Sequence, residues 1–310
     1  MTTRHRRNAR LNDAHKLAQG HGSIPTAGLR RAIEHANSRV DPRVTEKMRS
    51  SMAIATALRP SRRRKNAAPR ATLSEETLHT IATRIARRSV RAPKFVAPDS
   101  GILDASYSLR LTPGYTYGDI AINQFRYHEP ATSVVVQRHS GRMGFSYLAD
   151  NTAEFGKRRH VSVMLGTFVI PLFEGTLTAH VEPTLSFSWW AIAHGAAAWS
   201  LAGLSLSIVA YSFSGTHAGS DAVESLSLWE RLPMEDDLVN NVTFDFGSRT
   251  VPLTTTRTVD PGHFYLVSLT CDGAAGSNVY PPFSSISGGT LDLALPFIDL
   301  SVRYLPLATL

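Results

Sequence analysis

A two-residue periodicity dominates the sequence from about residue 105 onward and limits what this part of the chain can form. Apolar and polar residues alternate in short runs that include TSVVVQ, TLTAHVE, NVTFDF and DLSVRYL. These runs are rich in β-branched and aromatic residues, as is typical of strands. Turn signals separate the runs at residues 113–114, 140–141, 173–175, 260–262 and 271–273. Many short strands at this spacing predict an all-β fold, an antiparallel β-sandwich of the jelly-roll type.

The segment 183–219 contains no Asp, Glu, Lys or Arg and is long enough to cross a bilayer. Within it, however, Leu185, Phe187 and Trp189 alternate with serines, and the same alternation returns at 204–208. A membrane-spanning helix gives no reason for serines at every second position, whereas an amphipathic strand does. We therefore expect two strands joined through the small, apolar residues 194–200, which are also a candidate subunit contact.

The charges of the chain divide sharply along its length. Residues 1–100 contain 22 Lys and Arg against 7 Asp and Glu, which leaves +15, and residues 101–310 contain 11 against 18, which leaves −7. We therefore divide the chain into a basic N-terminal arm, 1–95, and a β-sandwich domain, 96–310. A basic block of this kind predicts an anionic partner, although a tail that only aids solubility has the same composition.

The arm has no aromatic residue before Phe95, so stacking on nucleic-acid bases has no support in its sequence. Contacts to phosphates, independent of base sequence and sensitive to salt, are what its arginines favour. Pro60 and Pro69 bracket its densest basic block. The predicted nucleic-acid-binding residues are Arg4, Arg6, Arg7, Arg10, Arg59, Arg62, Arg63, Arg64, Lys65 and Arg70.

Short helical patterns punctuate the arm. Leu29, Ala32, Ile33 and Ala36 share one helical face, a weaker pattern follows at 44–52, and the strongest of the three lies at 74–89. Such narrow apolar stripes cannot form a core of their own. We expect these segments to be partly helical or disordered until they contact the sandwich, a neighbouring molecule or a polyanion.

The sequence contains no catalytic or cofactor motif, so we predict a protein that is not an enzyme, with no cofactor, no metal and no small-molecule substrate. Cys271 is the only cysteine and ends a strand pattern, where a buried apolar role is expected. The histidines after residue 100 lack metal-site spacing and read as scattered structural residues. The acidic run 234–238 is consistent with a solvated turn or with a set of Ca²⁺ ligands. The basic run 156–160 is consistent with a contact to a polyanion or with charges that protect a strand edge from pairing with another chain.

A basic arm carrying RHRRNAR and RPSRRRKNAAPR ahead of an all-β domain resembles the coat proteins of small icosahedral RNA viruses. The resemblance lies in the layout of the whole chain. It implies a structural protein that self-assembles as a homo-oligomer, forms a closed icosahedral shell and packages RNA through phosphate contacts. It also implies a location in the virion and in the cytoplasm of the host cell. The aspartate-lined calcium site and the projecting domain common in that family are not evident here.

Three other functions fit parts of the sequence. One is a cellular β-sandwich binding module whose basic arm anchors it to nucleic acid or to an anionic membrane surface. Another is a membrane-inserting protein that uses residues 185–211. The third is an enzyme whose site is assembled from dispersed His and acidic residues.

Overall fold

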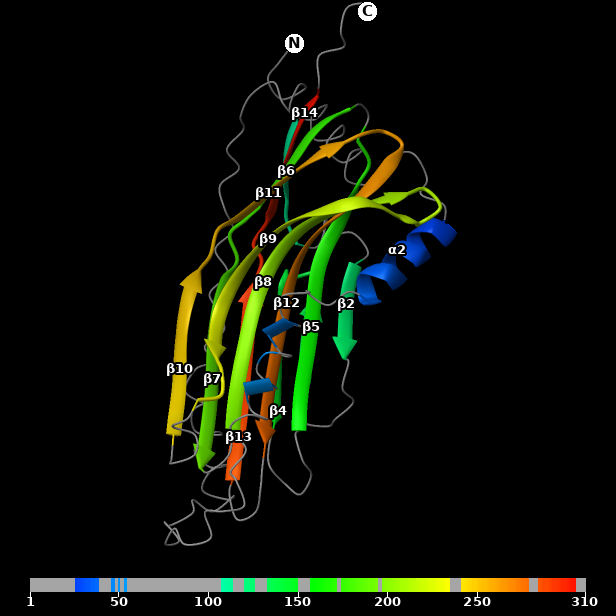
Figure 1. The fold of residues 1–310 in the computed structure, drawn as a ribbon. Helices are drawn as coiled ribbons and strands as arrows, with labels where there is room; N and C mark the ends of the chain where they lie inside the picture. The colour runs from blue at the N-terminus through cyan, green and yellow to red at the C-terminus, as the bar shows by residue number, and fades with distance from the viewer. Residues whose placement is uncertain are drawn as a thin grey trace, which may run out of the picture.

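The computed structural model describes residues 26–38, 46–47, 50, 53–54, 107–113, 120–125, 133–149, 157–171, 174–194, 197–234, 241–278 and 284–304. Within these residues the chain forms the helix α2 (Thr26–Ser38) and fourteen strands in antiparallel sheets (Figure 1). The predicted all-β sandwich, preceded by a basic and partly helical arm, is confirmed.

Two five-stranded sheets form the body of the sandwich. The first has the order β10 (Asn241–Thr250), β7 (Thr184–His194), β13 (Ser284–Ala294), β4 (Arg142–Ala149) and β3 (Ser133–Gln137). The second has the order β2 (Ile120–Phe125), β5 (Lys157–Val169), β12 (His263–Asn278), β8 (Ala197–Ser212) and β9 (His217–Arg231). A smaller sheet has the order β1 (Tyr107–Leu111), β14 (Ile298–Tyr304), β6 (Gly175–Val181) and β11 (Leu253–Val259).

The order of these strands is that of a jelly roll. Leaving the outer strands β2 and β3 aside, one sheet reads β10-β7-β13-β4 and the other reads β5-β12-β8-β9. The chain therefore crosses repeatedly between the sheets and folds as two interlocked Greek keys, which defines the jelly-roll winding. Apart from the hairpins β3–β4 and β8–β9, the neighbours in the two large sheets are not consecutive in the chain, so the sandwich forms only when the whole domain folds.

Prolines bend one side of the sandwich at a common level. β6 continues into β7 across Pro183, β10 into β11 across Pro252, and β13 into β14 across Pro296. Proline cannot donate a ladder hydrogen bond, so each of the three strands is interrupted there. The Val251 N–H donates to the Pro183 carbonyl at 3.0 Å and holds two of the bends together. The smaller sheet is thus the bent continuation of the first (Figure 1).

A polar network inside the sandwich ties the two large sheets together. The Trp229 indole N–H donates to the Ser200 hydroxyl at 3.1 Å, and the Tyr147 hydroxyl donates to the Leu201 carbonyl at 2.9 Å. Ser200 in turn donates to the Gly288 carbonyl at 3.1 Å. Burial raises the pKa of Tyr147 well above its usual range, so the phenol stays protonated and remains a donor.

Arginines close the edge at which β9 faces β10 and β11. The Arg257 guanidinium donates to the carbonyls of Ser220 at 2.6 Å and of Ala218 at 3.0 Å. Arg249 donates to the carbonyl of Leu228 at 3.0 Å. These carbonyls belong to an outer strand, so the guanidinium groups occupy acceptors that another chain would otherwise pair with.

Two sequence predictions need correction. Residues 271–273 are not a turn but lie inside β12. The glycine of this run is explained by packing, because Gly273 lies beneath the rings of Phe145 and Tyr147, where a larger side chain would collide. The predicted connection 194–200 is shorter than expected, since His194 ends β7 and β8 already begins at Ala197. The two predicted strands of this segment are confirmed, and no helix among the described residues is long and apolar enough to span a membrane.

Candidate interaction surface

The strand β10 presents its apolar residues to solvent. Val242, Phe244 and Phe246 alternate along it and are 44%, 49% and 52% exposed. They face outward because Phe244 is in register with Trp190 and Phe246 with Ser188, and both of these lie on the outer face of β7. Thr243, Asp245 and Gly247 are left on the side that faces the second sheet. β10 is therefore an amphipathic strand with its apolar face turned out.

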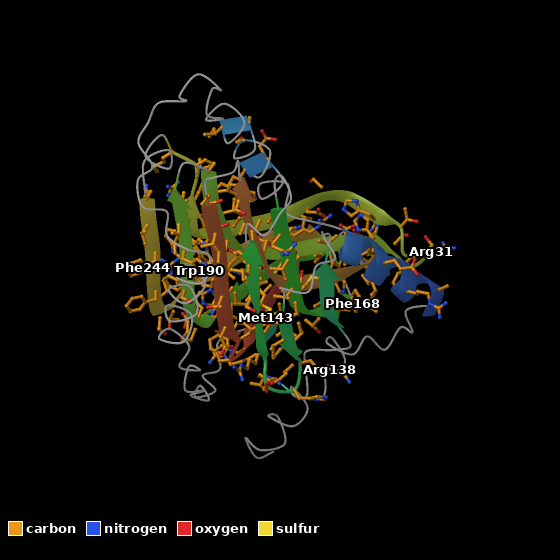
Figure 2. All side chains as sticks on the ribbon, turned by 90° about the horizontal axis from the view of Figure 1, so that it is seen from below. Arg31, Arg138, Met143, Phe168, Trp190 and Phe244 are labelled. Atoms are coloured by element: carbon orange, nitrogen blue, oxygen red, sulfur yellow. The ribbon has the colours of Figure 1, made fainter. Side chains whose placement is uncertain are left out.

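This orientation is unusual because an amphipathic strand normally buries its apolar side. The two phenylalanines are the only aromatic side chains among the large exposed apolar ones in the described part of the chain. Figure 2 shows Phe244 at the edge of the sandwich, projecting away from it. An exposed apolar patch of this kind marks a contact surface more often than an isolated exposed leucine does.

Buried apolar side chains lie next to these exposed residues on the neighbouring strands of the sheet. Val242 is in register with Ile192, which in turn pairs with Ile286, and both isoleucines are buried. Trp190 is 4% exposed and lies across Gly288, where a Cβ atom would meet its ring. Its indole N–H has no hydrogen-bond partner among the described residues. We call Val242, Phe244 and Phe246 the β10 surface.

The free main chain of β10 is partly capped. Among the described residues β10 pairs only with β7, so its other edge is not continued by a strand. The Asp245 carboxylate accepts the Phe246 N–H at 2.8 Å. A donor occupied in this way resists pairing with another strand. The β10 surface is therefore suited to packing through its side chains rather than to extending the sheet.

All ten predicted nucleic-acid-binding residues, from Arg4 to Arg70, lie outside the described residues, so their role stays a prediction. The basic run 156–160 falls at the start of β5, and there Arg159 points into the protein. It is 2% exposed and donates to the Leu148 carbonyl at 2.9 Å. Burial lowers the pKa of Arg159. This residue serves the fold and does not contribute to a basic surface.

The other candidate groups are structural or isolated where the structure describes them. Cys271 is fully buried in β12, and burial raises the pKa of its thiol. No three His, Cys, Asp or Glu side chains of the described residues gather in a way that could hold a metal ion. Of the acidic run 234–238, only Met234 lies within the described part.

Comparisons with known proteins add little to this geometry. The chain matches no protein family, and it matches no curated protein. Among solved structures, a carbohydrate-binding module in complex with β-1,4-galactotriose aligns with 58% of this chain and 86% of its own, at 14% identity and a TM-score of 0.22. A TM-score that low carries no argument about function. The fold assignment rests on the order and register of the strands.

The sequence predicted β10 as a strand, but its alternation did not indicate which face it would expose. The run NVTFDF alternates regularly, and alternation defines two faces without saying which one lies inward. One residue did indicate the inner face. Gly247 leaves room there for the Phe187 ring, because a Cβ atom at Gly247 would come within 3.2 Å of that ring.

Proposed function

We propose that the chain is a self-assembling structural protein whose jelly-roll sandwiches form a closed shell and whose Arg-rich arm binds RNA through phosphates. The observation that carries the proposal is the outward-turned apolar face of β10. A strand of this kind is stable in water only at a cost, and a second copy of the chain removes that cost by covering it.

The energies are of the right size for an assembly of many weak contacts. Burying the exposed half of a phenylalanine contributes about 1 kcal/mol, so Phe244 and Phe246 together supply a modest term for each contact. Contacts of this size repeat over every subunit of a shell and add up across it. The charge split supports the second half of the proposal, because +15 on residues 1–100 can neutralise phosphates while the −7 remainder stays apart from them.

The first test is size-exclusion chromatography of the full chain expressed in bacteria, with absorbance read at 260 and 280 nm. We expect large uniform particles rich in nucleic acid. The double variant Phe244→Ser/Phe246→Ser should elute as small species. Val135→Ser is the matched control, because Val135 is 40% exposed on β3 at the opposite edge of the same sheet, and it should assemble normally. Equal assembly of all three proteins would remove the β10 surface from the proposal.

The second test concerns the arm. A chain that begins near Ala92 should lose the absorbance at 260 nm, and nucleic acid bound to the full chain should be released as salt increases. A full chain that elutes at low salt as a monomer free of nucleic acid would contradict the proposal. Monomers that bind anionic vesicles in a salt-sensitive way would instead favour a cellular binding module with a basic anchor.

A further inference from the structure

The row of outward side chains on β10 continues into β11 without a charge. Alternate positions from residue 242 to residue 258 are all exposed, and none of them is Asp, Glu, Lys or Arg. They are Val242, Phe244, Phe246, Ser248, Thr250, Pro252, Thr254, Thr256 and Thr258. The charged residues of the same stretch, Asp245, Arg249 and Arg257, occupy the other set of alternate positions. Since about a quarter to a third of a soluble surface is normally charged, this exposed row is depleted in charge.

Beyond the proline bend the row becomes part of a face of threonines on two paired strands. Thr254, Thr256 and Thr258 of β11 are exposed, and Thr176 and Thr178 of β6 are partly buried beside them. Thr256 is in register with Thr178, and Thr258 with Thr176 (Figure 1). We call these threonines of β6 and β11 the threonine face. Its positions repeat at about 4.8 Å between strands and about 6.8 Å along each strand, the spacings of an antiparallel sheet.

The main chain at the outer edge of β11 is engaged by β9. The Thr254 N–H donates to the Glu224 carboxylate, and the Arg257 guanidinium donates to the carbonyls of Ala218 and Ser220. These contacts oppose the addition of a further strand at this edge. A partner of the threonine face therefore packs on its side chains.

The hydroxyl groups of this face suit a partner that carries the same groups. Thr178 and Thr256 share one hydrogen bond, with 3.1 Å between their hydroxyl oxygens. That bond uses one of their two hydroxyl protons, so the pair can still donate one hydrogen bond and accept others. Burying a hydroxyl without a partner costs free energy. A second face with the same spacing offers donors and acceptors at matching positions and so avoids that cost.

Other classes of partner find less to bind here. The outward positions of these two strands, residues 176, 178, 180, 254, 256 and 258, include no Lys or Arg to bind phosphates. They include no Phe, Tyr or Trp on which nucleic-acid bases could stack. Two copies of one chain carry the same charges, so like charges at a shared contact repel. A face without charge is therefore one that two copies can bury.

We propose that the threonine face is a second contact between copies of this chain, in which the hydroxyl rows of two molecules face each other. The proposal rests on the proposed function, because it adds a contact to the same assembly. A subunit that pairs through one self-complementary surface stops at a dimer, whereas a closed shell needs further contacts. The β10 surface supplies apolar side chains for one contact, and the threonine face supplies hydrogen bonds for another.

The test places charges on the threonine face and then neutralises them. Thr256→Lys/Thr258→Lys and Thr256→Glu/Thr258→Glu each bring like charges together when two copies meet. In size-exclusion chromatography with light scattering, the particle fraction of each full-length variant alone should fall about tenfold or more. An equal mixture of the two variants should recover the particles, because opposite charges then meet. A mixture that stays as small species would contradict contact between two copies.

The matched control is Ser133→Lys/Val135→Lys, which adds the same charge at two exposed, alternate positions of β3. β3 lies at the edge of the first sheet away from β10, and Ser133 shares a hydroxyl hydrogen bond with Ser146. This variant should form particles as the wild type does. Loss of its particles would show that added charge acts regardless of position, which would overturn the assignment to the threonine face.

The outcomes separate this contact from the assembly as a whole. If the wild type forms particles and the Lys and Glu variants each do so equally well, the threonine face is refuted while the proposed function stands. If the wild type forms no particles, the proposed function fails. The mixture of Lys and Glu variants then decides the contact by itself, since mixed dimers support it and monomers overturn it.

Discussion

Both large sheets carry aromatic side chains on their outer faces, yet the two faces end up in opposite situations. On the second sheet Phe264 contacts the rings of Phe168, Tyr211 and Phe213 at 5.4 to 6.1 Å, and α2 covers this cluster. On the first sheet Phe244 and Phe246 remain about half exposed. Figures 1 and 2 place α2 and β10 on opposite sides of the sandwich.

The difference teaches that the outward orientation of an aromatic residue does not by itself create a binding surface. The chain supplies a helix for one face, and that face becomes a second small core. Among the described residues, no helix covers the exposed phenylalanines of β10 in the same way. We therefore interpret the first face as an intramolecular contact, and we propose that the second is a contact made between copies of the chain.

The largest expected effect comes from making the same substitution on both faces. Phe264→Ala should lower the free energy of unfolding by about 3–4 kcal/mol, because Phe264 is fully buried and its removal leaves a cavity under α2. Phe244→Ala should change it by about 0.5 kcal/mol or less, because half of that ring is already in water. Urea unfolding of dissociated subunits, followed by tryptophan fluorescence, measures both. Similar losses for the two variants would contradict the comparison.

A somewhat smaller effect is expected when the helix is displaced and the sheet beneath it is left intact. Ala32→Arg places a long charged side chain at a fully buried position facing the sheet. The helix should detach rather than bury the charge, at a cost of about 2–3 kcal/mol in lost apolar contact. Protection of residues 26–38 from hydrogen–deuterium exchange should then be lost while β8 and β12 stay protected. Glu34→Arg, on the exposed side of the same helix, should leave protection unchanged.

Much of the fold follows from local sequence patterns. Alternation predicted the strands that become β3, β6, β7, β8, β10, β12 and β14, and the spacing of Ala32, Ile33 and Ala36 predicted the buried face of α2. The turn at 260–262 formed where Asp-Pro-Gly predicted it. These successes share one cause: each depends on residues that are close in sequence and whose backbone preferences agree with the final structure.

The features that matter for function depend on contacts between distant segments, which one sequence does not reveal. The outward face of β10 is set by its register with β7, and a shift of one residue would turn Phe244 inward. The covering of Phe264 by α2 likewise joins residues that are more than 200 positions apart in the sequence. The turn predicted at 271–273 failed for a related reason, since Gly273 lies within β12 and packs beneath the rings of Phe145 and Tyr147.

The smallest expected effect concerns the turn beside the covered face, where Asp260 is the acceptor for three donors. Its carboxylate binds His263 at 2.8 Å, the Gly262 N–H at 2.8 Å and the Tyr265 hydroxyl at 3.1 Å. Burial raises the pKa of Asp260, but these hydrogen bonds outweigh it and hold the pKa below its usual value. The resulting stability is present above the usual carboxyl pKa, near 4, and is lost as the pH falls through the lower folded value.

Asp260→Asn should therefore lower the free energy of unfolding by about 0.5 kcal/mol at pH 7. The loss is small because the Asp260 side chain is 41% exposed and water screens its contacts. The difference from the wild type should shrink between about pH 4 and pH 2, where the wild-type carboxylate becomes protonated as well. Urea unfolding at a series of pH values measures it. Asp245→Asn on β10 is the matched control. The Asp245 carboxylate accepts the backbone N–H of Phe246, whereas the Asp260 carboxylate accepts from a backbone N–H and two side chains. Its effect should be smaller at pH 7. A difference for Asp260→Asn that grows in acid would show that the carboxylate destabilises the turn, contrary to the geometry around it.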